Sequence, residues 1–386
     1  MNILLLSQFF STTKGGGEYV FNIMAKVLAD NDNKVWVITN RIKNERYNSH
    51  ENIKIVFVKP EIEYRGGLPT GILENLRYFF NATRKGVSII KKEGIDVIHS
   101  NNFAPAIAGS FLSTFTGMPH ITTVHDVFSL CGNDYWKLWG KQNNVSFMNV
   151  MLGPFYEKML LKLKYEAIHT VSESTKDDLL KFGATKRIFI IPNAIEEAEY
   201  SNTDTPEFDF ISIGRLVFYK NLEVIIKAMN VITKSYPQVK LLIVGDGPHR
   251  PILEKIVREL KLNNNVKFTG YVSNEEKNKL LSSAKALVFP SLCEGFGLVI
   301  LEAFAHQKPV LCANIRPSSD IITDKKNGFL ISPHNYEEWA NSFKNIIEKP
   351  DEAIQIGKEG KKLLEEKYNI QNMIHNLMKM YSQVLK

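Results

Sequence analysis

Short apolar runs alternate along the chain with longer segments in which apolar residues recur at every third or fourth position. In the first half these recurrences predict a helix after the loop from Ser7 to Gly17, with Val20, Ile23 and Val27 on one face. Further helices are predicted at 71–92, 104–115, 151–164 and 173–182, the last with Ser172 as its cap. Buried strands are predicted at 3–6, 35–38, 53–58, 96–99, 121–124, 167–171 and 188–191. Strands that alternate with helices predict a parallel, doubly wound sheet.

A polar, proline-containing segment at 193–207 interrupts this alternation, which then begins again. The second half has predicted strands at 208–213, 240–244, 266–269, 286–289, 309–312 and 328–331. Its predicted helices are 221–233, 249–261, 274–283, 297–306, 336–348, 351–366 and 370–385. The chain therefore reads as an α/β protein with two Rossmann-like halves joined by a linker. A ligand is expected in the central cleft that faces the carboxyl ends of both sheets.

Composition limits the classes of function. The 386 residues are 44% hydrophobic and 23% charged, which is typical of a globular protein of two domains. The net charge of +7 is spread without a basic block, which argues against a nucleic-acid partner. Three cysteines, at 131, 293 and 312, have no metal-ligand spacing and suit a reducing cytoplasm. The start lacks a basic signal region and no run reaches spanning length, so we expect a cytoplasmic protein that is at most peripheral on a membrane.

Two carboxylates, Glu294 and Glu302, bracket a glycine-rich turn between a predicted strand and a predicted helix. Glycines at 295 and 297 allow a phosphate to approach the backbone, and the first N–H groups of a helix favour an anion. Glu302 lies among apolar residues, where a carboxylate needs donors, and the two hydroxyls of a ribose would supply them. The alternative is a plain turn with Glu302 directed at solvent.

Arg215 and Lys220 flank the turn that follows the first strand of the second half. Two cations at this spacing can converge on one diphosphate, with Arg binding two oxygens and Lys acting as a point charge. Asn221 is placed to cap the next helix. A second turn, from Gly245 to Pro248, puts a proline at the predicted first position of a helix. Solvated charges and ordinary turn glycines remain the alternatives.

In the first half, Gly15, Gly16 and Gly17 precede the first helix without forming a dinucleotide fingerprint or a Walker loop. They still leave backbone N–H groups and space for a ligand. His125 ends a strand on the side where open α/β sheets bind ligands, so it is a candidate for contact with a sugar hydroxyl or for proton transfer, with a structural role as the alternative.

No cluster of His, Cys or Glu suggests a metal site. Asp30-Asn31-Asp32 matches an Asp-x-Asp pattern, but it falls between a helix and a strand, where Asp and Asn are ordinary turn residues. We therefore expect neither a metal ion nor a cofactor.

Residues 73–92 combine apolar and basic positions, and no acidic residue falls between Arg77 and Lys92. Lys158, Lys162 and Lys164 form a second basic helix face. Helices that lie on anionic membranes have this pattern, and so do solvated helices packed on a core.

Taken together, these motifs resemble the GT-B glycosyltransferases of the large retaining family 4, and the resemblance covers nearly the whole chain. It rests on the order and spacing of short motifs, among them the glycine loop, the segment from Thr123 to Asp126, and the two carboxylates with seven residues between them. It also includes the remaining matching segments: 170–174, 191–193, 214–216 with 220–221, 245–248 and 270–272.

The resemblance implies a nucleotide-diphosphate sugar donor, such as a UDP- or GDP-sugar, a glycan or lipid-linked acceptor, and hexosyl transfer with retained configuration and no essential metal. It implies that Arg215 and Lys220 stabilise the departing diphosphate, with backbone N–H groups of Phe296, Gly297, Leu298 and Val299. Glu302 would bind the ribose, Glu294 the donor sugar, and His125 the sugar or the reaction centre. The remaining donor-binding residues that it implies are Gly16, Gly17, Asn193, Gly245 and Val272.

Residues 1–193 would form the acceptor-side domain and 208–368 the donor domain, and the helix within 369–386 would cross back to the first domain. Cell-surface polysaccharide or glycolipid synthesis is the implied pathway. Three other enzyme types stay open: a GT-B epimerase, a GT-B phosphorylase and, against the missing fingerprint, a Rossmann dehydrogenase. A non-catalytic nucleotide-sugar binder also stays open.

Overall fold

The computed structural model describes the chain apart from residues 12–15, 48, 64–70, 133, 146 and 197–205. The described residues form two compact units. The first comprises 1–136, 145–194 and 370–386, and the second comprises 137–144 and 195–369. Each unit is built on one parallel sheet, so the predicted fold class of two Rossmann-like, doubly wound domains is confirmed.

The sheet of the first unit has seven strands in the order β3-β2-β1-β4-β5-β6-β7. Their bounds are β1 Asn2–Leu6, β2 Lys34–Ile42, β3 Ile53–Ile62, β4 Val97–Ser100, β5 His120–Val124, β6 Ala167–Thr170 and β7 Arg187–Ile190. The strand order reverses between β1 and β4, which pair in parallel. This reversal is the switch point at which open sheets of this kind bind ligands.

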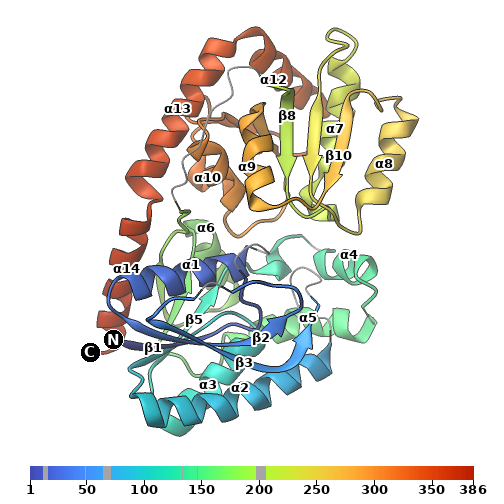
Figure 1. The fold of residues 1–386 in the computed structure, drawn as a ribbon. Helices are drawn as coiled ribbons and strands as arrows, with labels where there is room; N and C mark the ends of the chain where they lie inside the picture. Colours follow the sequence, from blue (N-terminus) through green and yellow to red (C-terminus); the bar gives the residue numbers. More distant parts are fainter. Residues whose placement is uncertain (12–15, 48, 64–70, 133, 146, 197–205) are drawn as a thin grey trace. The chain divides into compact units, whose positions relative to one another are not determined.

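Helices cover both faces of this sheet, as Figure 1 shows for α1 on one face and for α2 and α3 on the other. The helical segments of the unit are α1 Gly17–Asp30, α2 Ile72–Glu93, α3 Ala104–Thr116, η1 Phe128–Leu130, α5 Phe147–Leu160, α6 Glu173–Phe182 and α14 Ile370–Val384. Helix α4, Tyr135–Gln142, begins in this unit and belongs mostly to the second. Along β1, Ile3 and Leu5 pack toward α1 and α14, whereas Leu4 and Leu6 pack toward α2 and α3. Because β1 is buried on both faces, its sequence is a continuous apolar run.

The sheet of the second unit has the order β10-β9-β8-β11-β12-β13, and its strand order reverses between β8 and β11. The strands are β8 Phe208–Ile213, β9 Leu241–Val244, β10 Val266–Gly270, β11 Ala284–Phe289, β12 Val310–Ala313 and β13 Phe329–Ile331. The helical segments are η2 Phe218–Lys220, α7 Leu222–Ile232, α8 Arg250–Glu259, α9 Asn274–Ser282, α10 Leu298–Ala305, α11 Ser318–Ile321, α12 Tyr336–Glu348 and α13 Pro350–Lys367.

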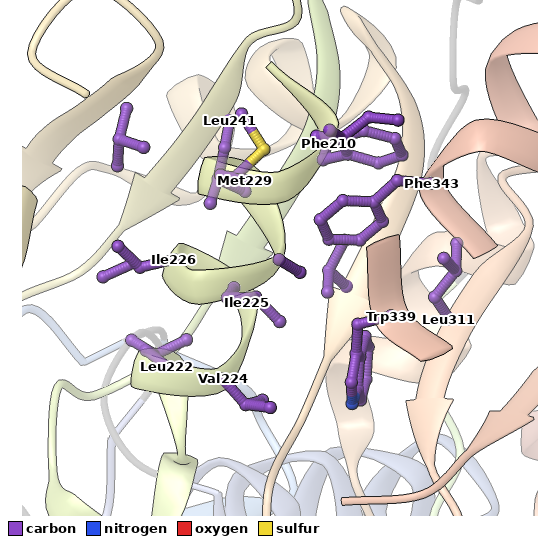
Figure 2. Close-up of a cluster of buried hydrophobic side chains, with 14 of the residues drawn as sticks. Phe210, Leu222, Val224, Ile225, Ile226, Met229, Leu241, Leu311, Trp339 and Phe343 are labelled. Carbon is purple, nitrogen blue, oxygen red and sulfur yellow. The ribbon is translucent and has the colours of Figure 1, made fainter. Parts of the chain in front are cut away.

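Helix α7 is fixed by a large apolar core (Figure 2). Its buried face packs on the sheet and against α12, from which Trp339 and Phe343 project toward it. The ring of Phe343 stacks on Phe210 of β8 with a centroid distance of 4.1 Å. Because Leu222 is buried in this core and follows Lys220 by two residues, the core also holds the loop after β8 in place.

Several local expectations hold and others fail. The hydroxyl of Ser172 accepts the backbone N–H of Thr175 at 3.1 Å, so its predicted cap is confirmed. Helix α8 begins at Arg250, and Pro251 lies in its first turn, so the prediction that Pro248 opens this helix is wrong. The predicted helix at 151–164 begins earlier, at Phe147, and α4 and α11 were not predicted.

Candidate active site

One candidate region, in the second unit, surrounds the switch point of the second sheet, where the loops after β8 and β11 are neighbours. Lys220 ends η2 in the first loop and Glu294 lies in the second, and the ammonium group of Lys220 forms an ion pair with the Glu294 carboxylate. Their side chains are only 18% and 14% exposed. The backbone N–H of Leu292 donates to the carbonyl of Tyr219 at 2.7 Å, so the two loops are also joined through the main chain.

Asn221 fixes the same junction in an unexpected way. It occupies the N-cap position of α7, but its backbone is left-handed, with φ of 53°, and its side chain does not cap the helix. Its amide donates instead to the carbonyls of Pro290 at 3.2 Å and Pro333 at 2.8 Å. The predicted capping role is therefore wrong, and the side chain ties together the loops that follow β8, β11 and β13.

Helix α10 presents its N-terminus at this junction. Its N-cap is Gly297, with φ of 94°, and no side-chain cap is formed there by any described residue. The N–H groups at the start of α10 therefore keep the positive end of the helix open to an anion. Phe296 is buried and packs edge-on against Tyr368, so only its backbone can reach a ligand, whereas Leu298 and Val299 are half-buried.

Glu302 lies on α10 and has a partner that the sequence did not reveal. Its carboxylate accepts from the ammonium group of Lys277 on α9 at 2.7 Å, and both side chains are mostly buried. The pair leaves a second carboxylate oxygen for a ligand. No spacing in the sequence marks this contact, because Lys277 and Glu302 lie on separate helices.

The glycines of this unit are required by packing. Gly245 has φ of 126°, and a Cβ there would lie 2.0 Å from the carbonyl oxygen of Gly214. At Gly247 a Cβ would lie 2.3 Å from the carbonyl oxygen of Leu216. The loop after β9 therefore lies directly on the loop that carries Arg215, whose guanidinium donates to Asn143 Oδ1 at 3.4 Å within the same unit. Val272, half-buried, follows the end of β10.

A second candidate region, in the first unit, lies at the switch point of the first sheet. Gly16 is the N-cap of α1, and no described atom lies within 4 Å of the place where its Cβ would be. At Gly17, which opens α1, a Cβ would lie 3.1 Å from the ring of His125 and 3.8 Å from the amide nitrogen of Asn101. The loops after β1, β4 and β5 therefore meet here. Gly15 lies outside the described residues.

His125 is partly buried, and desolvation of its ring together with the nearby His169 lowers its pKa to about 3. The imidazole is therefore neutral at physiological pH. Its Nε2 is buried and has no hydrogen-bond partner among the described residues, and the same holds for Oδ1 of Asn193. A buried polar atom without a partner is costly, and such atoms at a ligand-binding edge are where a substrate would complete the hydrogen bond.

A chain of hydrogen bonds runs beside His125, from the C-terminal helix to the end of β7. Tyr381 of α14 bonds His99 Nδ1 at 2.7 Å, His99 Nε2 bonds Thr123 at 2.7 Å, and Thr123 bonds His169 Nδ1 at 3.0 Å. His169 Nε2 then donates to the carbonyl of Ile191 at 3.2 Å. A carbonyl only accepts, so every proton in the chain is fixed: Tyr381 donates to His99, His99 to Thr123, and Thr123 to His169. Sequence reasoning missed this network.

Among the described residues, no group of three or more His, Cys, Asp or Glu side chains is arranged to hold a metal ion. In the same part of the chain, no helix is both long and apolar enough to cross a membrane.

Each half of the chain matches the profile of a known protein family. The profile of the family Glyco_transf_4, described as Glycosyltransferase Family 4, matches residues 14–199, and that of Glycos_transf_1, described as Glycosyl transferases group 1, matches residues 193–363. An uncharacterized glycosyltransferase of Methanocaldococcus jannaschii is 25% identical over 93% of this chain and 92% of its own.

Two solved structures share the fold along their whole length. Sucrose-phosphate synthase from Thermosynechococcus elongatus superposes with a TM-score of 0.84 at 20% identity, covering 100% of this chain and 99% of its own. HepE from Anabaena, in complex with UDP and glucose, has a TM-score of 0.75 at 19% identity, covering 99% and 100%. With two family profiles that together span residues 14–363, the chain belongs to the GT-B glycosyltransferases of the family 4 type.

Proposed function

We propose that this glycosyltransferase moves a hexose from a UDP- or GDP-sugar to a hydroxyl of a glycan or lipid-linked acceptor, with retained anomeric configuration and without an essential metal ion. The observation that carries the proposal is the Lys220–Glu294 ion pair, which lies beside the open N-terminus of α10 at a sheet switch point. Cations and helix N–H groups gathered at one place suit a diphosphate.

The leaving group explains why charge is needed there. When the bond between the sugar and the diphosphate breaks, the electron pair stays on the phosphate oxygen, and the sugar becomes oxocarbenium-like. Fixed positive charge at that oxygen lowers the barrier most, because it acts where negative charge develops. Arg215, Lys220 and the backbone from Phe296 to Val299 supply it in this proposal, in place of a metal ion.

Glu294 has a role distinct from that of the cations. A carboxylate oxygen held by the ammonium group of Lys220 is a weaker nucleophile than a free carboxylate, which supports attack by the acceptor hydroxyl on the same face as the leaving group. The acceptor proton then passes to an oxygen of the departing diphosphate. Glu294 would bind hydroxyls of the donor sugar, Glu302 the ribose hydroxyls, and the backbone near Gly245 and Val272 the base.

In the first unit we assign His125 to the donor sugar. Its lowered pKa makes it a neutral hydrogen-bonding group with no proton to give as an imidazolium, and its unpartnered Nε2 supports contact with a sugar hydroxyl. Gly16 and Gly17 provide space for the phosphates and the acceptor. Asn193 offers a second unpartnered buried atom, Oδ1.

The experiment is a panel of UDP-, GDP- and ADP-sugars, first by thermal shift and then by slow hydrolysis without acceptor, since a ligand that binds the native state raises its apparent stability. We expect one nucleotide class to raise the melting temperature and one sugar to be released with the α or β configuration of the donor, as read by NMR. Inverted product would contradict the retaining mechanism, and loss of turnover in excess chelator would contradict metal independence.

The same panel separates the alternatives. A phosphorylase would release sugar phosphate when inorganic phosphate is added, and an epimerase would return an altered free sugar from every turnover. A non-catalytic binder would give the thermal shift with no hydrolysis or transfer to any acceptor. HepE is in complex with UDP and glucose, which supports starting the panel with UDP-sugars.

For the acceptor, we propose a cell-surface polysaccharide or glycolipid precursor that is elongated in the cytoplasm at the inner face of the membrane. Peripheral contact through residues 73–92 would bring the enzyme to such an acceptor. Exposed apolar and basic side chains on the helices of the first unit bear on which surface would contact the membrane.

A further inference from the structure

Helix α2 exposes the apolar residues of its N-terminal half instead of burying them. Tyr78 and Ala82 face the core, whereas Leu73 and Phe80 are 68% and 66% exposed. At 100° per residue, Leu73, Phe80 and the exposed Arg84 fall on one stripe opposite that core face. The C-terminal half is ordinary, since Val87 and Ile90 pack on the core. The membrane-like pattern expected over 73–92 therefore belongs to the first half of this helix.

Helix α5 repeats the arrangement, which sequence reasoning did not detect. Phe147, Met151 and Phe155 are 75%, 65% and 69% exposed and recur at every fourth position. The exposed Lys158 continues their stripe in the next turn. Both α2 and α5 carry the chain back toward the start of the next strand of the same parallel sheet. In each helix the exposed apolar turns come first, and exposed cations follow them.

Helix α3 lies between α2 and the segment that follows α5. Its Phe111 contacts Phe79 of α2 with ring centroids 5.5 Å apart, and it contacts Phe115, which is 68% exposed. On its other side, Ser110 of α3 accepts from the backbone of Lys164, just beyond α5, at 3.0 Å. Figure 1 shows α2 and α3 side by side on the face of the sheet away from α1. We call the exposed surface of α2, α3 and α5 the docking face.

Charge decides which partner this face fits. Helix α3 contains no acidic residue, and α2 has none between Arg77 and Lys92. The acid of α5, Glu157, is buried and accepts from the backbone N–H groups of Phe128 and Ser129 at 2.8 and 2.9 Å. Glu74 is an exposed acid in the N-terminal half of α2, and the exposed Arg77, Arg84 and Lys158 outnumber it. Exposed aromatic rings with an excess of cations are complementary to an anionic lipid surface.

We propose that the docking face is the surface through which this protein binds an anionic bilayer, with the aromatic side chains of α2, α3 and α5 in the headgroup region and the cations against the lipid phosphates. Because both stripes begin at the carboxyl edge of the sheet, binding brings that edge, with Gly17 and His125, close to the lipid. The consequence for a lipid-linked acceptor rests on the proposed function, whereas bilayer binding itself does not.

The test is co-sedimentation of the full chain with vesicles of phosphatidylcholine alone and with about one quarter phosphatidylglycerol, at low and high salt. We expect binding to the anionic vesicles only, weakened by salt. The double variant Phe147→Ser with Phe155→Ser should lose binding at both salt concentrations. The matched control is Tyr271→Ser, an aromatic residue 74% exposed in the second unit, which should bind as the parent does.

A charge variant keeps the proposal testable if the aromatic variant is poorly folded. Lys158→Gln with Lys162→Gln should weaken binding roughly 25-fold, since each cation near an anionic surface contributes about fivefold. Lys255→Gln with Lys362→Gln, two exposed lysines of the second unit, should not. Failure of the parent protein to bind anionic vesicles would overturn the proposal, and so would equal losses in test and control variants. A change from dimer to monomer in the aromatic variant, without change in vesicle binding, would make the face a protein interface and also overturn it.

Catalysis gives an independent readout. Hydrolysis of the donor sugar by the aromatic variant should equal that of the parent, because the docking face contains no donor-binding residue. Failure of vesicle binding with normal donor turnover would remove the docking proposal and leave the transferase, whereas normal binding without turnover of any donor would do the reverse.

Discussion

The switch points of the two sheets have the same topology, but charged side chains lie at one and neutral side chains lie at the other. In the second unit the side chains form ion pairs, Lys220 with Glu294 and Lys277 with Glu302. In the first unit the corresponding edge contains neutral imidazoles, held by hydrogen bonds whose protons have one direction. A charged edge can bind a diphosphate. An uncharged edge can bind hydroxyl groups without competing for the diphosphate. The comparison teaches that topology sets the edge of a sheet at which a ligand can bind, and that side-chain charge sets which chemical groups suit that edge.

The largest expected effect tests the charged edge. Lys220→Ala or Glu294→Ala should lower turnover by about 10²- to 10³-fold, because each removes a group from the place where charge develops. The matched control is Lys285→Ala. Lys285 is also paired with a carboxylate, Asp209 at 2.7 Å, but near the starts of β11 and β8, at the opposite edge of the same sheet. Steady-state rates with a donor found by the panel give the comparison, and full activity in both test variants would remove the site assignment.

The next effect is acid destabilisation of the first unit, whose histidines lie at the carboxyl edge of its sheet and, for His120, at the start of β5. Burial lowers the pKa of His120 and His169 to about 4 and of His125 to about 3, and lowers that of His99 well below its usual value. A histidine with a lowered native pKa binds its proton more readily when unfolded. The free energy of unfolding is therefore unaffected by such a histidine above pH 6.5, and it decreases as the pH falls toward 4.

We expect the first unit to lose at least about 2 kcal/mol of stability between about pH 7 and pH 5. In the second unit His306 also has a pKa lowered to about 4, so this unit loses stability in the same pH range through that histidine. The hydrogen bond from His249 lowers the pKa of Glu223, and protonation of this carboxylate changes stability only below about pH 4.5. Hydrogen exchange read by mass spectrometry should show β5 and β6 losing protection before β8 and β11. Simultaneous loss in both sheets would contradict the contrast.

A smaller effect tests the direction of the hydrogen-bond chain. Tyr381→Phe removes the first donor and leaves Nδ1 of His99 buried without one, which should cost about 1–3 kcal/mol of unfolding free energy. Tyr236→Phe is the control, because its hydroxyl bonds Glu348 at the surface and its loss should not change stability measurably. Urea unfolding measures both, and an unchanged midpoint for Tyr381→Phe would show that the chain is not ordered as described.

The smallest effect concerns Lys277. If it holds Glu302 in the orientation that binds the ribose, Lys277→Met should raise the donor KM about 3- to 10-fold and leave kcat nearly unchanged, because the contact is equally strong in the ground and transition states. Michaelis curves for the donor separate the two parameters. An equal fall in kcat would place Lys277 in the chemistry instead.

The sequence predicted the parallel sheets because β1, β9 and most of β11 are apolar runs, and because apolar residues recur at helical spacing in α1 and α7. The family resemblance assigned both Lys220 and Glu294 to the donor, and in the structure both follow strands that are neighbours at a switch point. The sequence could not supply Lys277 or Tyr381, whose partners lie far away in the chain. At Asn221 and Pro248 a local rule was outweighed by loop packing, which only tertiary structure reveals.

The close contact of Gly245 and Gly247 with the neighbouring loop has a consequence for anyone who wishes to alter the nucleotide that this enzyme accepts. Any side chain at these two positions would displace the backbone of 214–216 before it touched a donor. A combinatorial library should therefore keep both glycines and randomise Tyr271 and Val272, where a new side chain has room and the scaffold would tolerate the change. The loop after β9 is thus fixed by its contact with the neighbouring backbone, and the loop after β10 is where variation can be introduced.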